Sequence, residues 1–153
     1  MASLTALTAV LLVLAAGQPS HRPIPAALSK QAPTVKWDSG SRIFADINDD
    51  QKPDEVFLGR AKGRIYVGIV LGGTGAVHTL DFAIDGGQQA AICAEPALLT
   101  TESMNYDPMP LVGRIPGLRS SDRYFGLRLS GGGCDAIHIY WDFEPNEPRW
   151  WRP

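Results

Sequence analysis

With 153 residues, of which 44% are hydrophobic and 20% charged, the chain has the size and composition of one soluble globular domain rather than a disordered polymer. It carries 14 basic and 16 acidic residues, a formal net charge of −2, and the basic residues are scattered along the sequence. Binding to the phosphates of nucleic acids needs a concentrated excess of Lys and Arg, so we expect no nucleic-acid partner.

The first residues have the pattern of a secretory signal peptide. The run Leu4–Ala16 contains no charged residue, and it is shorter than the roughly 20 residues that a membrane-spanning helix needs. The small residues Ala15–Gly17 fit the site at which a signal peptidase cuts. We therefore expect residues 1–17 to be removed, leaving a periplasmic or secreted protein that begins near Gln18 and has no membrane span. The alternative is a buried N-terminal helix.

Prolines are dense in residues 18–36, with polar residues between them: Pro19, Pro23, Pro25 and Pro33. Proline lacks a backbone N–H and fixes φ, so this density disfavours both a helix and a β-ladder. We interpret residues 18–36 as an extended, proline-rich leader. The folded part is then a single domain that comprises residues 37–153.

Short apolar runs rich in β-branched and aromatic residues follow, each bounded by glycines or other turn residues. They predict strands at Glu55–Leu58, Arg64–Leu71, Ala76–Phe82, Tyr124–Leu129, Cys134–Trp141 and Arg149–Trp151. Residues 85–121 are broken repeatedly by proline, and we expect them to be irregular with one or two strands. Within them, only Pro96–Ser103 could hold a turn or two of helix.

The expected fold class is therefore mostly β. Antiparallel meanders and hairpins would form one compact sheet or sandwich-like domain with little helix. Cys93 and Cys134 are the two cysteines, an even number in a chain that we expect to be exported, which favours a disulfide between them. The alternative is a pair of buried free thiols. A metal site built on these cysteines is not expected, because neither has another Cys or His at ligand spacing.

The segment Asp46–Asp54 carries the most specific chemical signal in the sequence. Oxygen-bearing side chains stand at its first, third, fifth and ninth positions, and the carbonyl of the seventh residue can complete the set, which is Asp46, Asn48, Asp50, Asp54 and Lys52. Calcium binds six to eight hard oxygen ligands, and a tight loop can bring these to one point. The loop is not an EF-hand, because Phe57 stands at the twelfth position in place of a bidentate glutamate.

The segment Phe44–Val56, an aspartate-rich loop followed at once by a strand, resembles the calcium loop of FG-GAP and VCBS-type repeats. The resemblance extends over Arg42–Leu71 and rests mainly on the loop. It implies Ca²⁺ bound by four side chains and one backbone carbonyl, namely those of Asp46, Asn48, Asp50, Asp54 and Lys52. No second copy of the loop is present, so the chain would hold one repeat.

This loop departs from the family pattern at two positions. Those repeats usually carry glycine where this chain has Asp49 and Gln51, and a residue with a Cβ adopts a positive φ only at a cost. We therefore expect a degenerate site of reduced affinity. The alternative is an acidic turn whose Asp and Asn side chains cap the backbone without an ion.

The carboxyl-terminal segment gathers aromatic residues and arginine. The candidate partner-binding residues are Tyr140, Arg149, Trp150 and Trp151, because such side chains anchor protein partners or stack on sugar rings. The segment resembles the end of small exported bacterial proteins that combine such a loop with an aromatic hairpin, and some proteins of this general kind inhibit lysozyme-like peptidoglycan hydrolases. The alternative is that both tryptophans pack in the core, one more exposed than the other because neighbours on a strand face opposite ways.

No catalytic constellation is evident. His21, His78 and His138 stand far apart in the sequence, and no Gly-x-Ser-x-Gly elbow or phosphate-binding loop is present. Glu95 and Glu102 form a carboxylate pair that a hydrolase could use, although the chain between them fixes no distance. We therefore expect an exported, non-catalytic, calcium-binding β domain that binds a macromolecule, either a protein such as a cell-wall hydrolase or a polysaccharide. The alternatives are an inhibitor or immunity protein of a lysozyme-like hydrolase, and a small carboxylate-dependent hydrolase.

Overall fold

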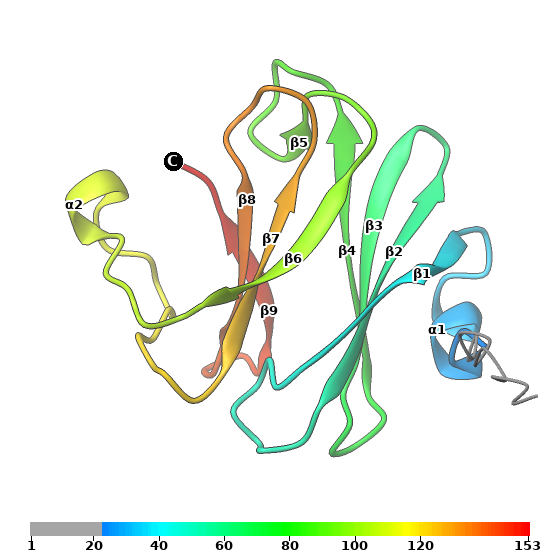
Figure 1. Ribbon diagram of the computed structural model, residues 1–153, viewed down its shortest axis with the longest axis horizontal. Helices are drawn as coiled ribbons and strands as arrows, with labels where there is room; N and C mark the ends of the chain where they lie inside the picture. Colours follow the sequence, from blue (N-terminus) through cyan, green and yellow to red (C-terminus); the bar gives the residue numbers. More distant parts are fainter. Residues whose placement is uncertain (1–22) are drawn as a thin grey trace, which may run out of the picture.

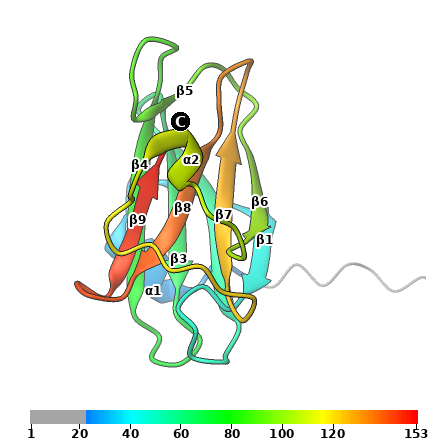
Figure 2. The ribbon, with the colours of Figure 1, turned by 90° about the vertical axis from the view of Figure 1, so that its left-hand side faces the viewer.

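The computed structural model of the protein describes residues 23–153. The predicted signal peptide and the first part of the predicted leader lie outside the described residues. Within residues 23–153, the strands form two sheets that face each other (Figures 1 and 2). The predicted fold class, a mostly β, sandwich-like domain with one disulfide and little helix, is confirmed. No helix in this part of the chain is long and apolar enough to cross a membrane.

The first sheet contains five strands in chain order, β1 (Lys36–Ala45), β2 (Asp54–Ala61), β3 (Arg64–Val70), β4 (Val77–Ile84) and β5 (Ala91–Ile92). The second sheet contains four, β6 (Leu98–Ser103), β7 (Phe125–Ser130), β8 (Ile137–Asp142) and β9 (Glu147–Trp151). Neighbouring strands are antiparallel except β4 and β5, which pair in parallel. The prediction of antiparallel pairing is therefore wrong only for the short strand β5.

The hairpin between β2 and β3 shows how local sequence sets the register of the first sheet. Lys62 and Gly63 form its turn, with φ of 47° and 69°. A two-residue turn in which both φ values are positive matches the twist of the flanking strands, and here it places Ala61 opposite Arg64. From this pair onward, alternate residues of both strands face the interior.

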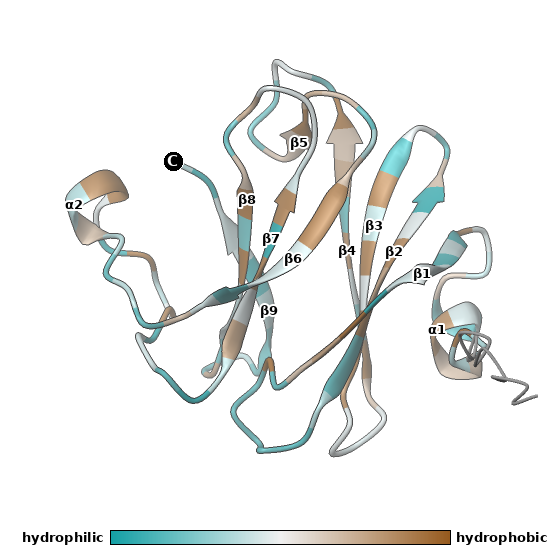
Figure 3. Cartoon of the chain, viewed as in Figure 1, coloured by the Kyte–Doolittle hydropathy of each residue, from teal (hydrophilic) through white to brown (hydrophobic). Residues whose placement is uncertain are grey.

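The interior faces of the two sheets share one hydrophobic core. Fully buried side chains recur at every second residue on β3 and β8, and these are Ile65, Val67, Ile69, Ile137, Ile139 and Trp141. Figure 3 shows the same alternation as brown bands along the strands. Burial of apolar surface contributes about 25 cal/mol per Å², so the core is the main source of stability.

A short helix, α1 (Ala26–Gln31), covers the outer face of the first sheet, so the prediction of an extended leader is wrong for these residues. Pro25 stands directly before the helix. Its lack of an N–H costs nothing there, because the N–H groups at the start of a helix have no intrahelical acceptor. Leu28 is fully buried against the sheet. Gly59 and Gly68 leave space for the side chains of Trp37 and Leu28 on this face. A Cβ on Gly59 would lie 2.6 Å from Trp37, and a Cβ on Gly68 would lie 2.6 Å from Leu28.

Residues 104–124 cross the outer face of the second sheet and carry α2 (Met109–Val112), which projects away from the sandwich (Figures 1 and 2). A second, smaller hydrophobic cluster forms beneath this segment around Met104, Tyr124 and Tyr140. The segment Pro96–Ser103, in which the sequence allows a turn or two of helix, instead contains β6, which pairs with β7. The residues predicted as irregular thus contain the two short strands β5 and β6.

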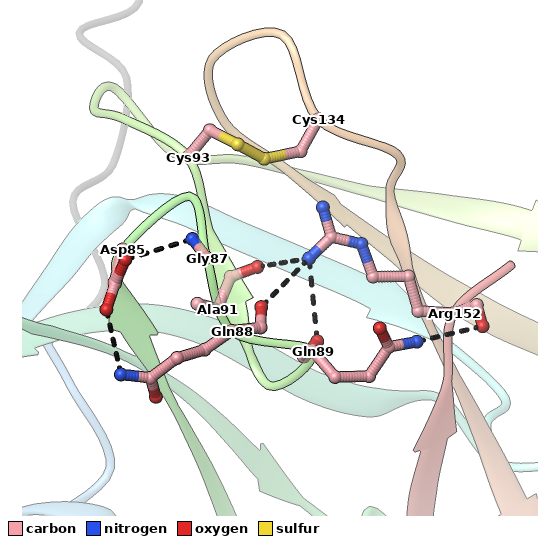
Figure 4. The surroundings of a disulfide bond; sticks show 8 residues. All are labelled: Asp85, Gly87, Gln88, Gln89, Ala91, Cys93, Cys134 and Arg152. Carbon is pink, nitrogen blue, oxygen red and sulfur yellow. Dashed lines mark hydrogen bonds between the residues drawn. A yellow bond between two sulfur atoms is a disulfide. The ribbon is translucent and has the colours of Figure 1, made fainter.

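The predicted disulfide between Cys93 and Cys134 is present, with the two Cα atoms 5.6 Å apart. It joins the chain just after β5 to the segment before β8 (Figure 4). Beside it, Arg152 donates to backbone carbonyls of residues 88–91, the shortest of these bonds being 2.8 Å to Ala91. The last strand is thereby fixed to the loop that precedes the disulfide.

Candidate functional site

The acidic loop, Asp46–Asp54, connects β1 to β2 at one end of the sandwich (Figure 1). Both sheets hold it. The backbone N–H of Phe125, at the start of β7, donates to the Asp46 carbonyl at 2.9 Å. Arg123, just before β7, forms an ion pair with Asp49. A change in the shape of this loop would therefore be transmitted to both sheets.

Two residues of the acidic loop adopt left-handed backbone conformations. Asp49 has a φ of 59° and Gln51 a φ of 64°. These are the two positions at which FG-GAP and VCBS-type loops usually carry glycine. A residue with a Cβ adopts this conformation at a cost of roughly 1 kcal/mol, although Asp tolerates it better than most. The loop thus makes both sharp turns without the glycines.

Three side chains of the acidic loop lie close together. The Asn48 amide lies 3.3 Å from Asp46 Oδ1 and 3.3 Å from Asp50 Oδ1, and hydrogen bonding favours its nitrogen in this position, whereas a shared cation would need its oxygen there. Two ligands bound at right angles to one calcium ion at about 2.4 Å would be about 3.4 Å apart, so the spacing fits a shared cation. If the amide is turned by half a revolution, its nitrogen donates to both carboxylates, which is the ion-free alternative.

Backbone N–H groups orient the two carboxylates. Asp46 accepts from the N–H of Asp50 at 3.2 Å and from that of Gln51 at 2.8 Å, and Asp50 accepts from the N–H of Lys52 at 2.9 Å. A carboxylate oxygen has two lone pairs, so each can keep its N–H partner while binding a cation. Gly73 confines Asp50 from the other side, because a Cβ there would lie 2.1 Å from Asp50 Oδ2.

Asp54 fixes the base of the acidic loop. It is 0% exposed, and its carboxylate accepts hydrogen bonds from the N–H of Ile47 at 2.8 Å and of Gly72 at 2.9 Å. Burial raises the pKa of Asp54 above its usual value. The two hydrogen bonds lower the pKa, and the negative charges of Asp50 and Asp46 raise it further. A cation bound beside these groups would offset their repulsion and lower the pKa of Asp54.

The candidate donors in the acidic loop are all oxygens, from carboxylates, an amide and the Lys52 carbonyl. Oxygen-only sets of this kind suit calcium rather than zinc or copper, which prefer nitrogen and sulfur ligands. Among residues 23–153, no group of three or more His, Cys, Asp or Glu side chains surrounds a common metal position. A metal site in this loop would therefore depend on the Asn48 amide and on the backbone.

The two terminal tryptophans pack on opposite sides of the second sheet. Trp150 meets Phe82 edge to face in the main core, with ring centroids 5.9 Å apart. Trp151 stacks on His138 at 4.3 Å, on the outer face. Both are partly buried, so each belongs to a hydrophobic cluster of its own, as the core-packing alternative predicts for neighbours on a strand.

The other two candidate partner-binding residues lie in different surroundings. Tyr140 is 4% exposed under residues 104–124, and its hydroxyl donates to the Pro116 carbonyl at 2.7 Å. Its ring is thus not available to a partner. Arg149 remains half-exposed, but it forms ion pairs with Asp142 at 3.2 Å and Glu147 at 3.0 Å. The candidate partner-binding residues of the carboxyl-terminal segment are therefore mainly packed against the rest of the protein.

The two glutamates considered for a hydrolase contact different partners. Glu95, ahead of β6, pairs with Arg60 of the first sheet at 3.0 Å. Glu102, near the end of β6, lies 2.8 Å from His138 Nδ1 on the outer face of the second sheet. Gly126 of β7 leaves room for this contact, since a Cβ there would lie 3.3 Å from Glu102 Cγ. No local sequence signal indicates the Glu102–His138 pair, because non-local strand pairing creates it.

Alkaline pH is expected to destabilise the protein through Tyr106, which packs in the outer cluster of the second sheet. Burial, helped by the charge of Glu102, raises the pKa of Tyr106 from 10.0 to about 12. The native state keeps a proton that the unfolded state releases above pH 10, so stability falls as the pH rises from 10 toward 12. We expect a loss of about 1–2 kcal/mol, measured by urea unfolding at neutral and alkaline pH.

The variant Tyr106→Phe should reduce this alkaline loss, since it retains the ring and removes the titrating hydroxyl. Burial also raises the pKa of Tyr124 and of Tyr140, so these two tyrosines contribute to the loss that remains. Tyr66→Phe, on β3 of the first sheet, is the matched control and should retain the loss. If Tyr106→Phe lost as much stability as the wild type, a different group would be responsible.

No family model, curated protein or solved structure matches the chain. The fold and the loop geometry therefore define its class in structural terms. It is a disulfide-bonded β-sandwich in which both sheets hold an acidic loop.

Proposed function

We propose that this protein is an exported, non-catalytic, calcium-binding β domain that serves as a binding module for another macromolecule. The convergence of the Asn48 amide with Asp46 and Asp50, at 3.3 Å from one carboxylate oxygen of each, carries the proposal, and ion binding would turn the amide oxygen toward them. These side chains and the Lys52 carbonyl hold the ion, and the acidic loop is a single, degenerate relative of FG-GAP and VCBS-type calcium loops. Asp54, which the sequence predicts as a further ligand, has a supporting role in this proposal instead, because among the described residues its carboxylate shares no metal position with those of Asp46 and Asp50.

Calcium has a structural role in this proposal. Two carboxylates that lie near each other and near Asp54 repel, and a divalent ion removes that repulsion. The ordered loop then supports its contacts to the second sheet, the hydrogen bond from Phe125 to Asp46 and the ion pair of Arg123 with Asp49. Calcium binding would in this way stabilise one whole end of the sandwich.

Calcium titration of the oxidised protein by calorimetry tests the proposal, with thermal melting as a second measurement. We expect saturable binding and a rise in Tm, because a ligand that binds only the native state adds about 2.7 kcal/mol at 100 times its Kd. Asp50→Ala should abolish both effects. Asp85→Ala is the matched control, since Asp85 also accepts a backbone N–H in an exposed turn, at 2.9 Å from Gly87, and it should bind as the wild type does.

The variant Asn48→Asp separates the ion-bound loop from the ion-free alternative. With calcium, a third carboxylate is a better ligand, so affinity should increase. In chelator, the same variant places three carboxylates together and removes any amide donor, so the protein should melt below the wild type. The ion-free alternative predicts that the variant melts below the wild type both with and without calcium, and that result would contradict the proposal.

The exposed apolar side chains favour a protein partner over a polysaccharide. Met109 and Leu111 on α2 are 56% and 79% exposed, and α2 projects from the sandwich (Figure 1). Such side chains fill apolar pockets on proteins, whereas polysaccharides present mostly hydroxyl groups. Inhibition of a lysozyme-like peptidoglycan hydrolase is an alternative form of this function. Full lysozyme activity in the presence of equimolar protein would count against that alternative.

A further inference from the structure

A cavity of about 360 Å³ lies at the end of β2 that is remote from the acidic loop. β2 leaves the acidic loop at Asp54 and reaches the cavity at Ala61. The polar residues around the cavity come from the segment before β1, from β1 to β3 with the turn between β2 and β3, and from the segment before β6. They are Thr34, Lys36, Arg60, Lys62, Arg64 and Glu95. The volume lies within the range of small-molecule sites.

Four cations lie at this end of the first sheet, three of them within five residues of the β2–β3 hairpin and the fourth brought to them by the pairing of β1 with β2. Lys36 of β1 lies directly opposite Arg60 of β2. Lys62 occupies the turn that follows, and Arg64 is the first residue of β3. Like charges directly opposite each other on antiparallel strands destabilise the pair by about 0.2–1 kcal/mol. These four residues define the basic cavity, and an anion within it would relieve their repulsion.

Carboxylates balance only part of this positive charge. Arg60 pairs with Glu95 at 3.0 Å, and Arg64 pairs with Asp81. Within residues 23–153, neither lysine of the basic cavity forms an ion pair. The arginine side chains remain 42% and 40% exposed. The cavity is thus locally positive on a protein whose net charge is −2, and a concave surface of one sign focuses its field on ligands.

We propose that the basic cavity binds an oxyanion, the phosphate or carboxylate group of a small ligand. An arginine fork can donate two parallel hydrogen bonds to such a group, and lysines add compact charges at flexible positions. Thr34 supplies a hydroxyl, and Ile84 an apolar wall for the remainder of the ligand. The full length of β2 separates the basic cavity from the acidic loop, so oxyanion binding does not depend on calcium.

Titration with inorganic phosphate and, separately, with succinate tests this proposal, using ¹H–¹⁵N spectra of the oxidised protein at constant ionic strength. We expect saturable shifts of the backbone N–H signals of Lys62 and Gly63 that chloride does not produce. Stronger binding of phosphate would indicate a phosphorylated ligand, and stronger binding of succinate a carboxylate. If neither anion caused larger shifts than chloride, the proposal would be overturned.

Variants show whether the cavity or the overall charge attracts the anion. Lys36→Gln combined with Lys62→Gln removes the unpaired charges and keeps both arginine ion pairs, and it should weaken binding about tenfold. Arg128→Gln combined with Arg114→Gln removes the same two charges outside the cavity, from β7 and from residues 104–124, and should bind as the wild type does. An unchanged affinity in the double lysine variant, or equal weakening in this control, would overturn the proposal. The melting temperature of each variant confirms that it is folded.

Discussion

Loss of the Cys93–Cys134 disulfide is expected to lower the free energy of unfolding by about 4 kcal/mol. The bond closes a loop between residues 41 positions apart, and without it the unfolded chain gains the conformational freedom of that loop. Contacts around the bond remain when it is broken, including the hydrogen bonds from Arg152 to residues 88–91. We therefore expect the reduced protein to keep its fold at lower stability, as measured by urea unfolding with and without reductant.

The double variant Cys93→Ser/Cys134→Ser separates loss of the bond from other effects of the reductant. Its urea midpoint should coincide with that of the reduced wild type and should not change when reductant is added. Superimposable unfolding curves for the oxidised and reduced wild type would contradict the prediction. They would mean that the unfolded chain has no more conformational freedom without the disulfide than with it.

The substitution Asp54→Ala is expected to cost about 3 kcal/mol even in calcium-free buffer, because a buried N–H without a partner costs about 1–3 kcal/mol. The Asp54 carboxylate accepts hydrogen bonds from two such N–H groups, those of Ile47 and Gly72, and Asp54 is 0% exposed. These bonds link the start of the acidic loop to the connection between β3 and β4. Chemical unfolding in the presence of a chelator measures the effect independently of any ion.

Asp85→Ala is again the appropriate comparison. Asp85 accepts one backbone N–H, from Gly87, and one side-chain N–H, from Gln88, but both hydrogen bonds are exposed. Water can replace the lost carboxylate there, so we expect a cost below about 1 kcal/mol. Similar losses in the two variants would show that burial of the Asp54 contacts adds nothing to stability.

The strands that the sequence predicts well are those whose signals are local. Arg64–Leu71 and Ala76–Phe82 are rich in β-branched or aromatic residues and are bounded by glycine turns, and they agree closely with β3 and β4. β1 is harder to predict, because Ser39–Ser41 interrupt its pattern where its pairing with β2 shifts register. α1 is also missed, since this short, proline-flanked helix depends on burying Leu28 against the sheet, which no local propensity reveals.

The same distinction applies to the sites. The candidate calcium ligands fall within nine consecutive residues, so their spacing alone suggests a site, and the structure adds that the Asn48 amide lies 3.3 Å from Asp46 and from Asp50. The Glu102–His138 contact and the basic cavity unite residues from different strands. Their formation depends on strand order and register. A count of lysines and arginines over the whole chain therefore misses the local positive surface, although Arg60, Lys62 and Arg64 stand within five consecutive residues.

The projecting helix α2 lies inside the covalent ring that the disulfide closes. Exposed segments of this kind are preferred sites of proteolytic cleavage. A single cut within α2 would leave two fragments joined by the disulfide and by the pairing of β6 with β7. The nicked molecule would migrate as one species in electrophoresis and separate into two only after reduction. A protease could thus sever the most exposed part of the chain without releasing either half of the sandwich.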